Sequence, residues 1–285
     1  MYPGQTSLIP NTVAIARYLE ENGLSSMFGN YPYWYLGTPF RYLAGPIVPL
    51  TLLLFHRIFQ NQNFFSLTFI LLFFSFLVST ASWGYFITKI SKNKKVGILI
   101  GVLTLILPWR YFSSIALGEA SFTIARNFLP LVLLSFWTYL KRKDTYSLLI
   151  SLALLTLVLL INTDILPIFI VGAVSIILAR NFDKGRFKGV LRDSKTLFLL
   201  VIYNLLLVSF LWYTPGYWLT ILTNPSIGGA SGIKVIFRAF NLLENFVPVV
   251  LAILSVYFSG KFRNKLSVFA AGWTLTFLFL TIFRF

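Results

Sequence analysis

The chain has no cysteine and very little histidine or negative charge. Its 285 residues include one histidine and eight acidic side chains. Without a thiol, the chain can form no disulfide, thiolate nucleophile or cysteine metal site. A single histidine also excludes any multi-histidine metal site. We therefore predict no metal site and no cofactor, and leave a divalent metal ion open. Residues 1–10 lack the basic and apolar regions of a secretory signal peptide.

Charged residues of either sign are also scarce, and this scarcity indicates the fold class. Only 11% of the residues are charged, 57% are hydrophobic, and the mean hydropathy is +0.80. A soluble domain usually has about 25% charged residues. Here the apolar residues form blocks separated by short basic stretches, as expected for several membrane-spanning helices. We predict an all-α protein, a polytopic transmembrane helical bundle in the plasma membrane.

The lengths of the apolar blocks predict about eight spans. A helix needs about 20 apolar residues to cross the hydrocarbon core. Between Arg41 and His56 lie 14 uncharged residues, which would reach only about 21 Å as a helix. We therefore expect an interfacial or re-entrant helix there rather than a ninth span. The predicted spans are residues 64–88, 96–115, 122–140, 145–161, 165–180, 196–214, 245–259 and 266–283.

The net charge of +16 comes from 24 Lys and Arg residues, which predict the orientation of the bundle. Sixteen of them lie in four connections on one face of the predicted bundle. The positive-inside rule assigns that face to the cytoplasm. Since the cations alternate with apolar blocks and form no single basic face, we predict no nucleic-acid partner. The four connections are residues 89–95, 141–144, 180–195 and 260–265.

This orientation divides the chain into two predicted regions. Residues 1–63 form an extracytoplasmic loop with juxtamembrane helices, and residues 64–285 form the bundle, with an outer loop at about 215–244. Asn11 and Thr12 can cap a helix that ends at Gly23. A dense aromatic segment follows at residues 30–40, and it permits two interpretations. It is an interfacial aromatic belt, or it is a wall on which a sugar ring or a lipid headgroup stacks.

Several short motifs in residues 1–60 resemble the GT-C superfamily, integral-membrane glycosyltransferases that use polyprenyl-phosphate sugars. The resemblance implies that a first transmembrane helix precedes Met1, so that the chain is a fragment; the alternative is a complete protein of nine segments. It also implies transfer of a sugar from a lipid-linked donor to an acceptor on the extracytoplasmic face. The matching motifs are Pro10-Asn11-Thr12, Glu20-Glu21-Asn22-Gly23, Tyr35-Leu36-Gly37-Thr38-Pro39-Phe40 and Gly45-Pro46-Ile47-Val48-Pro49-Leu50.

The resemblance and the predicted orientation select the candidate site residues. Asn11 stands where the resemblance implies an acid, and an amide cannot accept a proton as a carboxylate does. Arg126 lies inside an apolar span, where it must pair with an acid such as Glu119, reach the interface, or bind a lipid phosphate. The predicted catalytic residues are Glu20, Glu21 and Glu119, and the predicted substrate-binding residues are Asn11, Arg17, Arg126, Trp34 and Tyr35.

Two further hypotheses stay open at this point. The chain is a lipid or polysaccharide transporter or flippase, or it is a non-catalytic relative of the GT-C fold, which Asn11 supports. The expected partners are membrane lipids and a lipid-linked sugar donor. The sequence does not identify the sugar, the acceptor, the lipid carrier or the oligomeric state. We also expect residues 1–41, 116–126 and 215–244 to meet over one cavity that Glu20, Glu21, Glu119 and Arg126 face.

Overall fold

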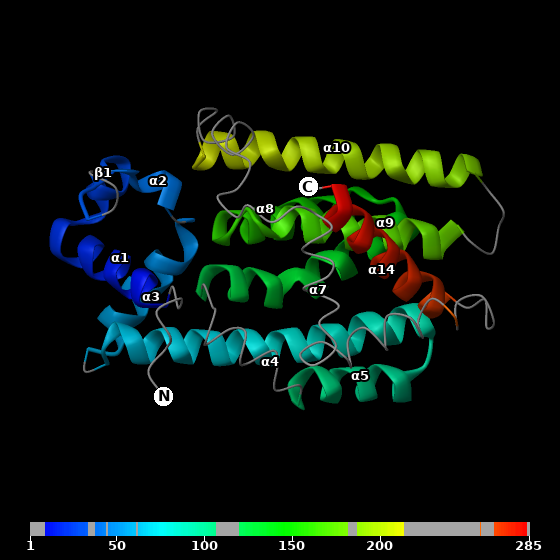
Figure 1. The fold of residues 1–285 in the computed structure, drawn as a ribbon, viewed down its shortest axis with the longest axis horizontal. Coiled ribbons are helices and arrows are strands. Elements are labelled where there is room, and N and C mark those ends of the chain that lie inside the picture. Colours follow the sequence, from blue (N-terminus) through cyan, green and yellow to red (C-terminus); the bar gives the residue numbers. More distant parts are fainter. Residues whose placement is uncertain are drawn as a thin grey trace.

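Long helices run side by side and short elements gather at one end of them, as Figure 1 shows for the computed structural model. The structure describes residues 9–33, 38–43, 45–60, 62–106, 120–181, 187–213, 257 and 265–283. We call the end that carries residues 9–60 the cap end. The opposite end carries the basic connections that the structure describes, and we call it the basic end.

The cap end is built from elements too short to cross a membrane. Helix α1 (Ile9–Asn22) is followed by the 3-10 helix η1 (Leu24–Phe28) and the strands β1 (Asn30–Tyr31) and β2 (Thr38–Pro39). The strands pair antiparallel, with Asn30 opposite Pro39 and Tyr31 opposite Thr38. Helices α2 (Phe40–Leu43) and α3 (Ile47–Ile58) complete the cap. The 12 residues of α3 reach about 18 Å, in agreement with the predicted short helix.

The termini of α1 test the predicted helix signals. Gly23 follows the helix with φ of +78°, a left-handed conformation that suits glycine, so the predicted stop is confirmed. The predicted start is wrong, because α1 already includes Ile9, and Asn11, the predicted cap, lies inside its first turn. Ile9, Ile15 and Leu19 turn one apolar face inward, and α1 packs with it on α3 and on the bundle.

The long helices correspond closely to most of the predicted apolar blocks. Asn63 caps α4, since its side-chain oxygen accepts a hydrogen bond from the backbone amide of Ser66 at 2.7 Å. Asp144 caps α8 through the amide of Ser147 in the same way. The block predicted at 245–259 lies, except for residue 257, outside the described residues. The helices are α4 (Phe64–Ser91), α5 (Lys94–Ile106), α7 (Ala120–Arg142), α8 (Thr145–Ile161), α9 (Ile165–Asn181), α10 (Phe187–Leu211) and α14 (Lys265–Phe283).

Three of the helices in the described part of the chain are long and apolar enough to cross a membrane. They are Phe64–Ser91, Ala120–Arg142 and Lys188–Leu211. Helices α8 and α9 have 17 residues each, which reach about 26 Å, slightly less than a hydrocarbon core of about 30 Å. The predicted helical membrane bundle is thus confirmed, whereas the count of eight spans is not.

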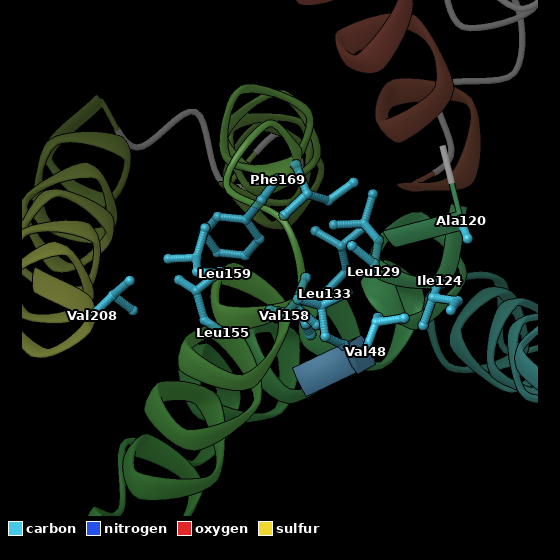
Figure 2. Packing of buried hydrophobic residues seen from close by; sticks show 14 of the residues in the cluster. Val48, Ala120, Ile124, Leu129, Leu133, Leu155, Val158, Leu159, Phe169 and Val208 are labelled. Carbon is cyan, nitrogen blue, oxygen red and sulfur yellow. The ribbon is translucent and has the colours of Figure 1, made fainter. Parts of the chain in front are cut away.

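Close helix packing depends on small residues at particular positions. A Cβ on Gly97 of α5 would collide with Thr88 and with the backbone oxygen of Gly84 in α4. The helices α7, α8, α9 and α10 meet in an apolar core, in which Leu133, Leu159 and Phe169 are fully buried (Figure 2). Two polar pairs join helices inside the bundle: Asn127 of α7 donates to Ser75 of α4 at 2.8 Å, and Thr156 of α8 donates to Asn204 of α10 at 2.7 Å.

Candidate functional site

A group of aromatic rings in mutual contact forms the centre of the cap end. Tyr18 of α1 lies edge-on to Tyr31 of β1, with 5.0 Å between the ring centroids, and Tyr31 lies 5.6 Å from Tyr33. Phe40, the first residue of α2, stacks against Tyr18 at 6.4 Å. Tyr31 and Phe40 are buried, but Tyr33 is 75% exposed. Burial, together with the phenols of Tyr33 and Tyr18, raises the pKa of Tyr31.

Arg41 lies beside these rings and joins the cap to the bundle. Its guanidinium carbon is 4.7 Å from the ring centroid of Phe28 in η1 and 5.6 Å from that of Trp212, which directly follows α10. Trp212 is buried, whereas Phe28 is 68% exposed. Ring faces attract a guanidinium without using its N–H donors. Arg41 can therefore still donate hydrogen bonds to an anion at the surface of the cap.

Glu20 belongs to a different contact, which connects three helices. Its Oε1 atom lies 3.0 Å from Nε2 of His56 at the end of α3. The other ring nitrogen, Nδ1, lies 2.8 Å from the backbone oxygen of Gln62, just before α4. The imidazole also stacks on Phe64 at 4.5 Å. Because a carbonyl oxygen only accepts, Nδ1 must carry a proton, and an additional proton on Nε2 satisfies the Glu20 carboxylate.

The structure places the remaining predicted site residues in several separate positions. Glu21 and Arg17 are exposed on α1, and Asn11 is half-buried in its first turn. Arg126 is half-buried in α7, almost two turns after the first residue of that helix. The predicted residues Trp34, Tyr35 and Glu119, like the loop 215–244, lie outside the described residues. The catalytic and substrate-binding roles, and the shared cavity, therefore stay predictions.

A buried acid at the basic end is the strongest polar cluster in the described structure. Asp193 of α10 is fully buried. Its carboxylate accepts a hydrogen bond from Arg180 at 2.5 Å and one from Asn181 at 3.1 Å. Lys143 Nζ lies 3.4 Å away, and Arg192 Nε lies 3.6 Å away. These contacts bring the α7–α8 connection, the end of α9 and the start of α10 together.

Sequence reasoning missed the partners of Arg41 and the role of Asp193. Arg41 lies in the predicted extracytoplasmic loop, but nothing in the sequence joins it to Trp212, which lies far along the chain. Asp193 stands in a segment rich in Lys and Arg, where it reads as one acid among many cations. An acid at the edge of a long apolar block was the available signal, because an ionisable group near membrane depth needs a partner.

The fold and a comparison with known families together define the class of the protein. Apolar helices long enough to span a bilayer make it a multi-pass membrane protein. A family profile described as "6-pyruvoyl-tetrahydropterin synthase related domain; membrane protein" matches residues 38–230. Since this match covers more than half of the chain, the protein belongs to that family. No curated protein and no solved structure gave a significant match.

This family assignment corrects the resemblance to the GT-C superfamily. The matching family is a different family of membrane proteins, not a family of GT-C glycosyltransferases. The resemblance was carried by an amphipathic helix, a Gly-x-Pro turn and a short proline-containing helix. Interfacial helices and aromatic belts also occur in membrane proteins of many other functions, so these motifs do not indicate sugar transfer. Among the described residues, no three His, Cys, Asp or Glu side chains come close enough to hold a metal ion.

Proposed function

We propose that this membrane protein binds the phosphate-bearing headgroup of a lipid-linked saccharide at its cap end. The proposal concerns binding only and includes no group-transfer step. It retains the lipid-linked partner that the sequence predicts, but not the sugar-transfer reaction of a glycosyltransferase. The observation that carries it is Arg41, held between Phe28 and Trp212 at the edge of an aromatic cluster.

The chemistry of this arrangement supports two kinds of contact at once. A guanidinium donates paired hydrogen bonds to a phosphate in a fixed geometry. The exposed rings of Phe28 and Tyr33 offer apolar faces on which a sugar ring can stack. No ion pair joins Arg41 to an acid in the described part of the chain. A bound phosphate would therefore not need to displace a described carboxylate.

The position of the cap fits a ligand that is anchored in the membrane. The cap covers one end of the helices α4 and α7, both long enough to span a bilayer. A headgroup at that level keeps its acyl chain beside the helices. The positive-inside rule predicts the extracytoplasmic side for this end, because the basic connections lie at the other one.

Binding of three related amphipaths to the purified protein tests the proposal. Decyl phosphoryl glucose has both groups, decyl phosphate lacks the sugar, and decyl glucoside lacks the phosphate. We expect Arg41→Gln to lower the affinity for decyl phosphoryl glucose about tenfold, since a hydrogen bond to a charged group contributes about 1.5–3 kcal/mol. Arg57→Gln, which removes an exposed arginine of the same cap, should leave binding unchanged.

Each outcome of this experiment bears on a separate part of the proposal. Equal affinity for decyl glucoside and decyl phosphoryl glucose would exclude recognition of the phosphate. Equal affinity for decyl phosphate and decyl phosphoryl glucose would exclude the sugar contact. If Arg57→Gln weakens binding as much as Arg41→Gln, the effect is one of general surface charge and the site is not at Arg41.

A further inference from the structure

Two ring contacts fix the ends of α4 and α14 against each other. Phe86 of α4 meets Phe269 of α14 with 5.5 Å between the ring centroids, and Trp83 meets Trp273 at 6.0 Å. Lys89 follows Phe86 by about one helical turn, toward the end of α4. Lys265, the first residue of α14, precedes Phe269 by about one turn. Both lysines therefore lie at the basic end of the same helix interface.

Two more lysines join this pair from neighbouring segments. Lys92 directly follows α4, where its left-handed backbone ends the helix. Lys141 lies one turn beyond Trp137 at the end of α7, with its Nζ atom 4.7 Å from the ring centroid of that tryptophan. Lys89, Lys92 and Lys265, together with Arg180, are all close enough to Lys141 to repel its charge. We call Lys89, Lys92, Lys141 and Lys265 the lysine cluster.

Two described acids, Asp144 and Asp193, lie at this end, and neither forms an ion pair with Lys89, Lys92 or Lys141. Asp144 accepts hydrogen bonds from Ser147. Asp193 is surrounded by Lys143, Arg180 and Arg192. Within the described ranges, ion pairs of Lys89, Lys92 or Lys141 with a carboxylate are not found. Lys89 instead has its Nζ atom 4.9 Å from the ring centroid of the exposed Tyr85. A contact with a ring face leaves the ammonium donors available to an anion.

Like charges held together by helix packing favour a counter-anion of high charge. Exposed cations repel one another over distances up to roughly 10 Å at moderate salt. A bound phosphate would attract all of the lysines and so offset their mutual repulsion. The lysines stand where the apolar parts of α4 and α7 end, which is the level of lipid headgroups. Basic pockets between transmembrane helices are known to take such headgroups.

We propose that the lysine cluster binds the headgroup of an anionic phospholipid that carries two phosphate charges. The four cations come from three helices and one connection at the end where the apolar parts of α4 and α7 stop. A singly charged headgroup would satisfy fewer of them. This site lies at the opposite end of the bundle from Arg41, so it does not rest on the proposed function.

Native mass spectrometry of the purified protein with defined lipids tests this site. The probes are cardiolipin with two phosphates, phosphatidylglycerol with one, zwitterionic phosphatidylcholine, and pyrophosphate as the free anion. The test variant combines Lys89→Gln, Lys141→Gln and Lys265→Gln. The matched control combines Lys95→Gln, Arg142→Gln and Lys188→Gln, which remove the same charge from exposed positions at the same end.

The proposal predicts different affinities for cardiolipin in these two variants. Each lysine contributes roughly 1 kcal/mol to binding of an anionic lipid, so the loss of three lysines should lower the affinity for cardiolipin about a hundredfold. The affinity of the control variant should stay within about threefold of the parent. Cardiolipin should also bind more tightly than phosphatidylglycerol. Equal losses in both variants would overturn the site in favour of diffuse attraction, and full competition by pyrophosphate would overturn a lipid as the ligand. If the triple variant does not fold, Lys141→Gln and Arg142→Gln allow the same comparison.

Discussion

The cap end and the basic end stabilise the same bundle with different interactions. At the cap end, short elements are held by edge-to-face ring contacts around Tyr31 and Phe40 and by the half-exposed pair of Glu20 and His56. At the basic end, a fully buried carboxylate on Asp193 gathers cations from three segments. A ligand can therefore reach polar and aromatic groups at the cap without disturbing the core, whereas the Asp193 network is part of the framework.

The largest effect in this comparison is expected from Asp193→Asn. The variant keeps the shape of the side chain but leaves Lys143 and Arg180 without their anion. Breaking a buried ion pair costs about 3–5 kcal/mol, and the partial exposure of both cations argues for the lower end, about 3 kcal/mol. Reversible unfolding in detergent measures it. Glu21→Gln, at an exposed position of α1, should change the free energy of unfolding by no more than about 0.5 kcal/mol, and an equally small effect of Asp193→Asn would contradict the assignment.

A second and smaller effect is expected where the cap joins the bundle. Gly45 is buried between α2 and α3, and an added Cβ would collide with the backbone oxygens of Leu160 and Ile161 at the end of α8. Neither backbone atom can move without shifting a helix. Gly45→Ala should therefore lower the free energy of unfolding by about 1–3 kcal/mol. It should also loosen the packing of the cap on the bundle, which faster proteolysis of residues 9–60 would measure. Gly29→Ala is the control, because its Cβ would have only an ordinary contact at 3.5 Å with Ser26.

The sequence predicts the helices and the basic end better than the contacts of the cap end. Apolar block lengths gave α8 with its observed bounds of Thr145–Ile161, because hydrophobic length and the cap at Asp144 are local signals. The gathering of basic connections at one end also followed from charge alone. The pairing of Arg41 with Trp212 could not be predicted, since it depends on how α10 packs beside the cap. Glu20 was predicted to be catalytic from its position, but its partner His56 becomes visible only when α1 folds onto α3.

The smallest expected effect concerns this pair of Glu20 and His56 and tests whether the carboxylate is structural. A double-mutant cycle with Glu20→Gln and His56→Ala isolates their coupling from the stacking of His56 on Phe64. Both side chains are partly exposed, so we expect a coupling of only about 0.2–1 kcal/mol. No coupling in this cycle would mean that the Glu20 carboxylate is available to a ligand, as the sequence alone predicts. A measurable coupling would identify Glu20 as a structural partner of His56, and the acid of a cap-end site would then have to be sought elsewhere on the cap.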